Sequence, residues 1–286
     1  MKYEFIKMNF GNFDIMRMCP VLGVSRSGYY AWLRRPKSKR AQENEILLEK
    51  IKIIHQRSKA IYGSPKIREE LKTEGVICGN NRVARLMKEN NIRSKIVKKF
   101  RNTKKSLPET EAFQNVLDRK FQVSEPNRSW VSDITYIWTK QGWVYLCIVL
   151  DLFSRKIIGW SVSENMGSDL VISAILIALR NRKIKKGLIF HSDRGVQYSS
   201  NVVVELLKRH HIMQSMSRKG NCWDNACSET FFHLLKSEEL DFIELREIEQ
   251  TRVKIFEYIE VFYNRTRIHS YLGYMSPVNF EKKLIG

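Results

Sequence analysis

The sequence predicts an α/β domain built on a mixed five-stranded sheet, with an all-α region before it and a helical tail after it. Two observations point to this fold class. After residue 125, three strand-like segments follow one another, and beyond them helical and strand-like segments alternate, as they do in a mixed sheet covered by helices. Before that point, helical segments are separated only by turn residues and basic stretches.

The charge of the chain is strongly asymmetric. The 286 residues include 50 Lys or Arg and 30 Asp or Glu, which gives a formal net charge of +20. Residues 1–124 carry 28 of the basic residues and only 12 of the acidic ones. An excess of this size indicates a polyanionic partner such as DNA. A basic helix lying on a membrane is less consistent with the pattern, because turn residues interrupt the basic stretches.

Nothing in the sequence predicts export or membrane insertion. The N-terminus lacks the continuous apolar segment of a signal peptide, and charged residues interrupt the most apolar stretch, 143–160. The five cysteines form no CxxC pair. We expect the cysteines to be reduced thiols. The alternative is a zinc site of Cys222, Cys227 and His233. We therefore expect a soluble cytoplasmic protein.

Residues 1–36 are expected to form a short helix-turn-helix-like segment, in which Ser25 caps the helix that follows it. A charged linker then leads to residues 41–92, which we interpret as a DNA-binding helix-turn-helix because two short helices flank a glycine-containing turn in a basic region. We expect Ser64 to cap the first of these and Asn80 or Asn81 the second. The residues expected to face inward are Ile46, Leu47, Ile51 and Ile54 in a helix over 41–57, Ile67 and Leu71 in the next helix, and Val83, Leu86 and Met87 in the last.

Residues 93–124 are expected to be a basic linker. The stretch 93–106 contains seven basic residues and no acidic one. A solvated linker and an arm lying along DNA phosphates are both consistent with this composition. As an arm, the segment would contact phosphates through Lys98, Lys99 and Arg101.

The α/β domain is expected over residues 125–240. Alternating apolar and polar residues, or apolar runs rich in β-branched side chains, indicate strands, and apolar residues at helical spacing indicate helices. A helical tail over 241–286 follows. The expected strands are 128–138, 142–154, 155–163, 187–193 and 212–217, and the expected helices are 168–181, 199–211, 225–239 and, in the tail, 245–263.

Three acidic side chains near the ends of these elements are expected to converge. Asp133 lies in the first strand and Asp193 ends the fourth, while Glu229 lies in the first turns of a helix, with 35 residues between it and Asp193. The first and fourth strands can lie side by side, with that helix across their ends. Close carboxylates repel each other unless a cation lies among them, and Mg²⁺ prefers such oxygen ligands. The acids therefore predict a site for divalent metal, in which two ions would serve phosphoryl transfer.

Each acid also has a purely structural interpretation. Asp133 suits a turn at a strand edge, Asp193 an Asx turn before Gly195, and Glu229 the first turn of a helix, where the macrodipole favours acids. A shared site explains all three at once. Among their neighbours, His191 fits either a structural role or a contact to metal or phosphate. We expect Asp151 to pair with Arg155, and Asp224 and Asn225 to cap the helix of Glu229. In the tail, Tyr263 is expected to pack against the last helix. The tail residues expected either to pack or to bind DNA are Asn264, Arg265, Arg267 and His269.

Asp133, Asp193 and Glu229 resemble the DD(35)E triad of retroviral integrases and bacterial insertion-sequence transposases. The segments "WVSDITY", "VLDLFSRKIIGW", "HSDRGVQY", "SRKGNCWDNACSETFFHLLKSE" and "YNRTRIHSYLGYMSP" resemble, in this order, the second-frame (OrfB) protein of the insertion sequence three family, from about Tyr29 to Phe280. The resemblance implies a ribonuclease-H-like integrase core, dependence on Mg²⁺ or Mn²⁺, and cleavage and joining of DNA at transposon ends by direct phosphoryl transfer.

The resemblance also implies partners. An upstream-frame protein with a helix-turn-helix and a leucine zipper would join this chain, as a frameshift fusion in many relatives, and the product would act as an oligomer on double-stranded DNA in the bacterial nucleoid. In integrases the helix equivalent to that of Glu229 lies against DNA. Lys236 shares a face with Glu229 and is the first phosphate contact we expect, ahead of a merely solvated lysine. His233 lies on the same face, and Arg218 and Lys219 lie in a loop beside it.

Two other functions are consistent with the same residues. A ribonuclease-H-like nuclease would cut DNA without joining it, and a DNA-binding regulator would bind without any chemistry. Strand transfer distinguishes the transposase from the nuclease, and metal-dependent nicking distinguishes either enzyme from the regulator.

Overall fold

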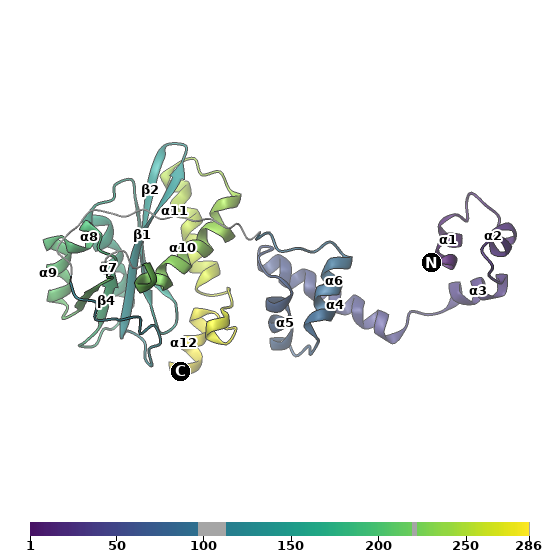
Figure 1. Cartoon of the computed structure of the whole chain (residues 1–286), viewed down its shortest axis with the longest axis horizontal. Helices are drawn as coiled ribbons and strands as arrows, with labels where there is room; N and C mark the ends of the chain where they lie inside the picture. The colour runs from purple at the N-terminus through teal and green to yellow at the C-terminus, as the bar shows by residue number, and fades with distance from the viewer. Residues whose placement is uncertain (97–112, 219–221, 286) are drawn as a thin grey trace.

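The protein, described here by a computed structural model of residues 1–96, 113–218 and 222–285, has an elongated outline (Figure 1). A sheet covered by helices forms the larger body at one end. The helices of residues 39–89 lie beside this body, and those of residues 2–34 lie apart from it at the N-terminal end. This order confirms the predicted fold class, an α/β domain between an all-α region and a helical tail.

The N-terminal helices α1 (Lys2–Met8), α2 (Ile15–Val21) and α3 (Arg26–Arg34) enclose a small apolar cluster of their own. Ser25 caps α3 as expected, because its Oγ accepts a hydrogen bond from the backbone N–H of Gly28 at 3.0 Å. The sequence indicated two helices here, and α1 is an additional one. The residues buried in the cluster are Ile6, Ile15, Met18, Cys19 and Tyr29.

A second helical unit consists of α4 (Lys39–Arg57), α5 (Ser64–Thr73) and α6 (Asn80–Glu89). The residues predicted to face inward are buried, with the exception of Ile46, which is 64% exposed. The two predicted caps are wrong by one residue or more. Gly63 and Gly79 hold the N-cap positions in extended conformation, so the polar side chains that follow them lie inside the helices and make no capping hydrogen bond.

The sheet has the strand order β3-β2-β1-β4-β5, and β2 runs antiparallel to the other strands. This is the ribonuclease-H-like arrangement, and the predicted antiparallel meander forms its first half. The parallel pairing of β1 with β4 covers only residues 129–131 of β1, so no strand of the described residues lies beside the rest of that edge. The strands are β1 (Ser129–Thr139), β2 (Gly142–Asp151), β3 (Ile157–Ser163), β4 (Ile189–Ser192) and β5 (Met213–Met216).

Helices cover both faces of the sheet (Figure 1). On one face, α7 (Ser168–Asn181) and α9 (Asn201–Arg209) pack over Trp130 and Phe190. Here α7 approaches β3 so closely that a Cβ at Gly159 would lie 2.2 Å from the carbonyl oxygen of Ala174. On the other face, α10 (Ala226–Glu238) and α11 (Ile248–Phe256) complete a second apolar cluster.

Short elements link these helices and extend the tail. The turn of α8 (Val196–Ser199) follows β4, and η1 (Cys222–Asn225) precedes α10. The tail helix predicted over 245–263 begins at Ile248 as α11 and continues as the π-helical η3 (Glu257–Tyr263). The remaining elements are η2 (Leu240–Phe242), η4 (Ser270–Leu272) and α12 (Pro277–Ile285).

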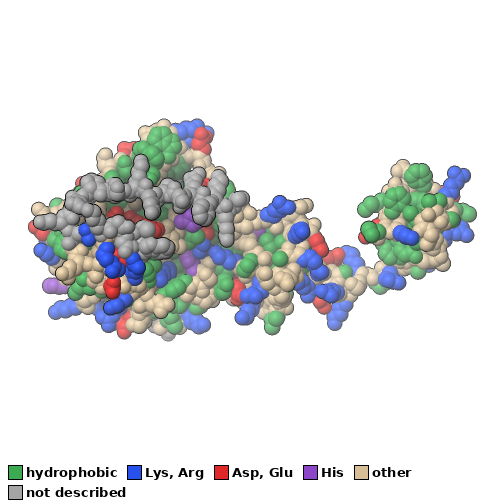
Figure 2. Space-filling model, viewed as in Figure 1, with side chains coloured by type: hydrophobic (Ala, Val, Ile, Leu, Met, Phe, Trp, Pro, Cys, Tyr) green, Lys and Arg blue, Asp and Glu red, His purple; other side chains and the backbone are tan. Residues whose placement is uncertain are grey.

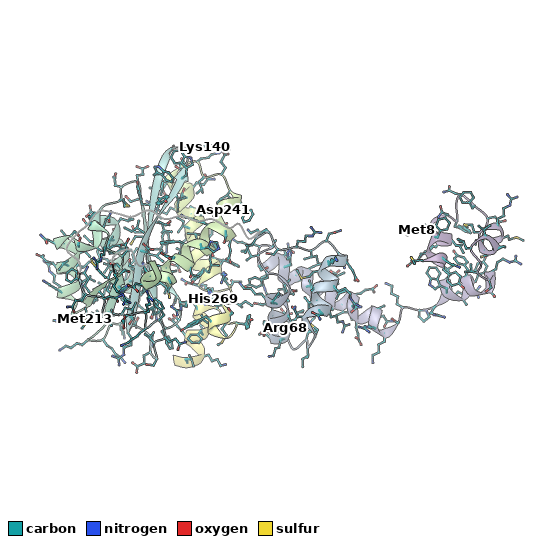
Figure 3. All side chains as sticks on the ribbon, in the orientation of Figure 1. Met8, Arg68, Lys140, Met213, Asp241 and His269 are labelled. Atoms are coloured by element: carbon teal, nitrogen blue, oxygen red, sulfur yellow. The ribbon has the colours of Figure 1, made fainter. Side chains whose placement is uncertain are left out.

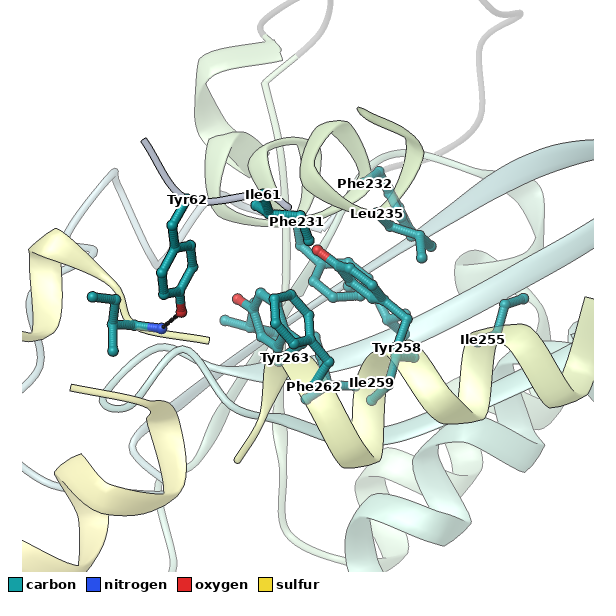
Figure 4. Close-up of a cluster of buried hydrophobic side chains, with 14 of the residues drawn as sticks. Ile61, Tyr62, Phe231, Phe232, Leu235, Ile255, Tyr258, Ile259, Phe262 and Tyr263 are labelled. Atoms are coloured by element: carbon teal, nitrogen blue, oxygen red, sulfur yellow. Dashed lines mark hydrogen bonds between the residues drawn. The ribbon is translucent and has the colours of Figure 1, made fainter. Parts of the chain in front are cut away.

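The second helical unit is anchored to the body through the tail (Figure 4). Ile61 and Tyr62, between α4 and α5, share an apolar cluster with Phe231 of α10 and with the aromatic residues of η3. The Tyr62 hydroxyl accepts a hydrogen bond from the backbone N–H of Ile268 at 2.8 Å. Tyr263 is buried in this cluster, which confirms the packing role predicted for it.

No helix in the described parts of the chain is long and apolar enough to cross a membrane. The cysteines whose side chains are described, Cys19, Cys78, Cys147 and Cys227, form no disulfide bond.

Candidate functional site

Asp133, within β1, and Asp193, just after the end of β4, lie at the same level of two neighbouring parallel strands. The last residue pair between β1 and β4 is Val131 with His191, and each aspartate lies two residues beyond it. The side chains of alternate strand residues point to the same face, so Asp133 shares the face of Val131, the one that α10 covers. The sheet register therefore brings to one level two acids between which the sequence contains β2, β3, α7 and β4.

The carboxyl of Asp133 is the electrostatic centre of this group. Burial raises its pKa well above the ordinary value, and the charges of Asp193 and Glu229 raise it further. A hydrogen bond of 2.8 Å from the backbone N–H of Ile134 and the charge of Lys236 act in the opposite direction. Asp193 and Glu229 thus both lie within electrostatic reach of the Asp133 carboxyl group, and their like charges disfavour its ionised form.

Asp193 is fixed by the turn that follows it. Its Oδ1 accepts a hydrogen bond from the backbone N–H of Gly195 at 3.0 Å, which is the Asx turn considered for this residue. Burial raises the pKa of Asp193, and this hydrogen bond partly opposes the effect. Glu229, in the first turn of α10, is more exposed than either aspartate, and partial desolvation raises its pKa.

The three acids have the chemistry of ligands for a divalent metal, but their spacing in this structure is too wide for one ion. Carboxylate oxygens are the ligands that Mg²⁺ and Mn²⁺ prefer, and a cation would relieve the repulsion that raises the pKa of Asp133. Among the described side chains, however, no three of His, Cys, Asp or Glu lie close enough together to hold an ion. Metal binding by all three acids would therefore require their carboxyl groups to lie closer together than they do in this structure.

Hydrogen bonds next to the aspartates connect β1 to α8 and to the start of α10. The hydroxyl groups of Ser132 on β1 and Tyr198 on α8 lie 2.9 Å apart. The side-chain amide of Asn225 donates to the backbone carbonyl of Ser132 at 3.2 Å and accepts from the Ser228 hydroxyl at 3.1 Å. Asn225 occupies the N-cap position of α10, as predicted, but its side chain makes no capping hydrogen bond and reaches across to β1 instead. Sequence analysis missed this link, which no local pattern signals.

His191 has a structural role. It is fully buried, with Nδ1 2.9 Å from the Ser215 hydroxyl and Nε2 3.2 Å from that of Ser217. Burial lowers its pKa to about 4, so the ring is neutral at physiological pH. These contacts tie β4 to β5 just before Asp193.

Asp224 also differs from its predicted capping role. It is fully buried and receives hydrogen bonds from Arg119 at 2.8 Å and from the side chain and backbone N–H of Arg218 at 3.0 and 2.9 Å. Although burial alone would raise its pKa, these partners hold the pKa below the ordinary value. Arg218 further pairs with Asp118 at 3.1 Å. The predicted DNA contact Arg218 is thus already engaged by two acids of the protein.

The other predicted DNA contacts are only partly described. His233 is exposed on α10, one turn after Glu229. Lys236 lies two turns after Glu229, partly buried, with Nζ 5.1 Å from the centre of the Tyr136 ring. Lys98, Lys99, Arg101 and Lys219 lie outside the described residues.

Asp151 has a structural role, as predicted, but the prediction that it pairs with Arg155 is wrong. It lies 3.9 Å from Arg182 and accepts hydrogen bonds from the backbone N–H groups of Asn127 and Phe153. Arg155 has a positive φ of 59°, and its guanidinium donates to the carbonyl oxygen of Phe121 and contacts the sulfur of Cys227.

Three of the tail residues left open by the sequence are buried. Asn264 exchanges two hydrogen bonds with the backbone of Ile157, at 3.0 and 2.9 Å. Arg267 forms a buried ion pair with Glu238 at 2.6 Å, and the ring of His269 packs against that of Tyr263. These side chains pack the tail and are not available to grip DNA.

Comparison with protein families gives matches along most of the chain. Residues 123–222 match the family described as integrase core domain, and residues 229–285 match a second family with the same description. Residues 41–100 match the family described as HTH-like domain. The first integrase core match includes Asp133 and Asp193, and the second begins at Glu229.

Curated proteins match over almost the full length. "Transposase InsF for insertion sequence IS3A" of Escherichia coli (strain K12) is 41% identical over 285 residues, which cover 99% of this chain and 99% of that protein. "Insertion element IS600 uncharacterized 31 kDa protein" of Shigella sonnei is 41% identical over 266 residues, which cover 93% of this chain and 98% of that protein.

Solved structures give a weaker likeness. The HTLV-2 integrase catalytic core domain in complex with magnesium (trimeric form) is 20% identical with a TM-score of 0.41, covering 54% of this chain and 96% of that one. A chain of the simian T-cell lymphotropic virus intasome in complex with PP2A regulatory subunit B56 gamma is 16% identical with a TM-score of 0.46, covering 81% of this chain and 73% of that one.

Proposed function

Because the chain belongs to the family of integrase-core transposases of insertion sequences such as IS3, we propose that Asp133, Asp193 and Glu229 hold the divalent metal with which it cuts and joins DNA. The chain is a DDE transposase, a polynucleotidyl transferase that acts in DNA transposition. The observation that carries the assignment of the acids is the level placement of Asp133 and Asp193 on parallel strands, with Glu229 within electrostatic reach.

The protein's own part is to hold carboxylate oxygens in place. Backbone N–H groups of Ile134 and Gly195 each engage one oxygen of an aspartate, which leaves the second oxygen of each available as a ligand. Glu229 would complete the set from the first turn of α10. Two bound ions would activate the attacking water or 3′-hydroxyl and stabilise the leaving oxygen. No side-chain nucleophile is required, since the DNA strand is attacked directly.

The DNA contacts follow from position and charge. Lys236 stands beside the acids, and its charge acts on Asp133, so it suits the phosphate next to the scissile one. We also assign phosphate contacts to His233 on the same helix face, to Lys219, and to Lys98, Lys99 and Arg101 of the basic stretch 93–106. Arg218 would make such a contact by exchanging its exposed partner Asp118 for a phosphate.

The rest of the chain divides by role. The helical unit within 41–92 would bind transposon ends, 93–124 would link it to the catalytic core of 125–240, and 241–286 would support that core. The segment 1–36 would supply a further helix-turn-helix-like contact. Each basic segment before residue 125 would add affinity for DNA, and this affinity would fall as the salt concentration rises.

Further expectations rest on the family resemblance. An upstream-frame protein with a helix-turn-helix and a leucine zipper would act with this chain, and the assembly would be an oligomer on double-stranded DNA. A bacterial protein of this kind would be found at the nucleoid.

Labelled duplexes bearing the ends of the parent insertion sequence test the proposal. The purified chain, with and without the upstream-frame protein, should nick and then join these ends with Mg²⁺ or Mn²⁺. Asp193→Asn should abolish both steps and retain DNA binding, while Asp169→Asn, an exposed aspartate of α7, should keep full activity.

Nicked but never joined ends would indicate the nuclease instead. Equal activity of Asp193→Asn and Asp169→Asn would show that the assigned acid takes no part in catalysis. Specific DNA binding without any metal-dependent product, under all of these conditions, would indicate the regulator.

A further inference from the structure

Three aromatic side chains form an exposed cluster at the free end of the β1–β2 hairpin. Tyr136, Trp138 and Trp143 are 60%, 61% and 48% exposed. Trp143 meets the other two rings edge to face, with centres 5.2 Å from Tyr136 and 4.9 Å from Trp138. Figure 2 shows hydrophobic side chains gathered where the hairpin ends, and Lys140 marks that end in Figure 3. Large exposed aromatic residues in a group indicate a binding surface.

Lys236 connects this cluster to the acids. Its Nζ lies 5.1 Å from the centre of the Tyr136 ring, and its charge also acts on Asp133. Tyr136 is three residues beyond Asp133 on β1, or about 10 Å along the strand. Because side chains alternate along a β-strand, the rings lie on the face of the sheet opposite to Asp133. A DNA strand held by Lys236 could pass from the acids to the rings around the open edge of β1.

The charge at the cluster suits a nucleic acid. Among the described side chains, no carboxylate lies within ion-pair distance of Lys236, so its charge is available to a phosphate. At the hairpin end, Lys140 pairs with the exposed Glu244 at 2.8 Å. A cation beside exposed rings provides one contact for a phosphate and another for a base, which is the combination that single-strand-binding surfaces use.

The size of the cluster argues against a protein partner. An aromatic side chain offers roughly 150–250 Å² of surface, so three rings exposed by about half offer on the order of 300 Å². A stable protein interface buries about 800 Å² on each side. Stacking on a base needs only the face of one ring.

We propose that Tyr136, Trp138 and Trp143 form a platform on which unpaired bases of the DNA strand stack, next to the phosphate held by Lys236. Bases inside a duplex already stack on each other, so the platform takes bases from a single-stranded or frayed end. The inference rests on the proposed function, because the acids and Lys236 define the path of the strand.

The test is binding of a fluorescein-labelled oligothymidylate of about twelve nucleotides, measured by anisotropy without divalent metal. A Trp138→Ala/Trp143→Ala variant should bind it about tenfold or more weakly, because stacking contributes roughly 1–3 kcal/mol per base. Binding of a duplex of the same length should be unchanged, since the basic segments carry it. Phe256→Ala, at an aromatic residue 49% exposed on α11, is the matched control and should bind both ligands normally.

Three binding results would overturn the inference: unchanged oligothymidylate binding by the double variant, an equal loss of single-strand and duplex binding, or an equal loss in the control. A change in sedimentation from a larger species to a monomer would identify the cluster as a contact between copies and would overturn it as well. The thermal unfolding midpoints of the variants establish that each is folded. Since the readout needs no catalysis, it fails separately from the nicking test of Asp193→Asn.

Discussion

Asn225 donates its side-chain amide to the backbone carbonyl oxygen of Ser132, the residue before Asp133, across a distance of 3.2 Å. The hydrogen bond joins the turn before α10 to the central strand. It therefore links the position of Glu229, four residues beyond Asn225, to that of Asp133. Ser228 completes the link by donating to the same side chain.

Replacing Asn225 with alanine should lower the rate of metal-dependent nicking more than it lowers stability. The change leaves the buried carbonyl of Ser132 and the hydroxyl of Ser228 without a partner, at a cost of about 1–3 kcal/mol in the free energy of unfolding. It also frees the first turn of α10 from β1, so Glu229 is held less firmly. The measurements are urea unfolding and the nicking rate per folded molecule.

Asn264→Ala is the matched control for this change, because Asn264 is an equally buried amide that bridges to the backbone of Ile157. It should lose similar stability and keep its nicking rate per folded molecule. Equal loss of rate in both variants would mean that Asn225 acts only through global stability.

Breaking the buried ion pair between Glu238 and Arg267 should strongly destabilise the protein. Glu238 accepts hydrogen bonds from Arg267 and from the Tyr258 hydroxyl, and both members of the pair are buried. Glu238→Gln leaves the guanidinium charge buried without a counter-charge, which should cost about 3–5 kcal/mol in the free energy of unfolding. Chemical denaturation measures this.

Glu205→Gln provides the comparison on the surface, since Glu205 pairs with Arg209 at 3.4 Å in an exposed i, i+4 arrangement on α9. It should change stability little, because solvent screens exposed pairs. The assignment of a stabilising role to Glu238 would be wrong if both variants unfolded at the same denaturant concentration.

Acid should weaken the protein through His191. Burial lowers the pKa of this ring from an ordinary 6.5 to about 4, and the charge of Asp224 opposes that effect. The neutral ring therefore contributes stability that is fully present above pH 6.5 and is lost as pH falls toward 4. The full loss is roughly 3 kcal/mol, since each pKa unit corresponds to about 1.4 kcal/mol.

Nuclear magnetic resonance of isotope-labelled histidine measures the protonation state of the His191 ring directly. The His191 signal, identified by its absence in His191→Asn, should show a neutral ring at pH 5.5. Titration of that signal near pH 6.5 would contradict the account of a buried ring held between Ser215 and Ser217.

The strands and most helices followed from the sequence because they depend on short-range patterns. Alternation along β1 and β2 and helical spacing in α5 and α6 reflect which face of an element is buried. The level of Asp133 and Asp193 follows from the parallel strand pairing. In α4, Ile46 breaks the pattern because the helix has apolar residues on two sides and only one is covered.

The errors concern details that the tertiary structure decides. Gly63 and Gly79 take the N-cap positions because the preceding loops enter the helices one residue earlier than the polar residues suggested. Asp151 pairs with Arg182 and not with the nearer Arg155, whose left-handed backbone directs its side chain elsewhere. Asn225 binds β1 across more than ninety residues of sequence, which no local rule anticipates.

Titration of the metal-free protein with Mn²⁺, followed by the loss of the free-ion paramagnetic resonance signal, tests the central claim most directly. We expect the wild-type chain with bound DNA ends to bind two ions, and Asp133→Asn, Asp193→Asn and Glu229→Gln each to bind at least one of them about tenfold more weakly. Undiminished Mn²⁺ binding in any one of these variants, with Asp169→Asn as the reference, would remove that acid from the metal site and contradict the account.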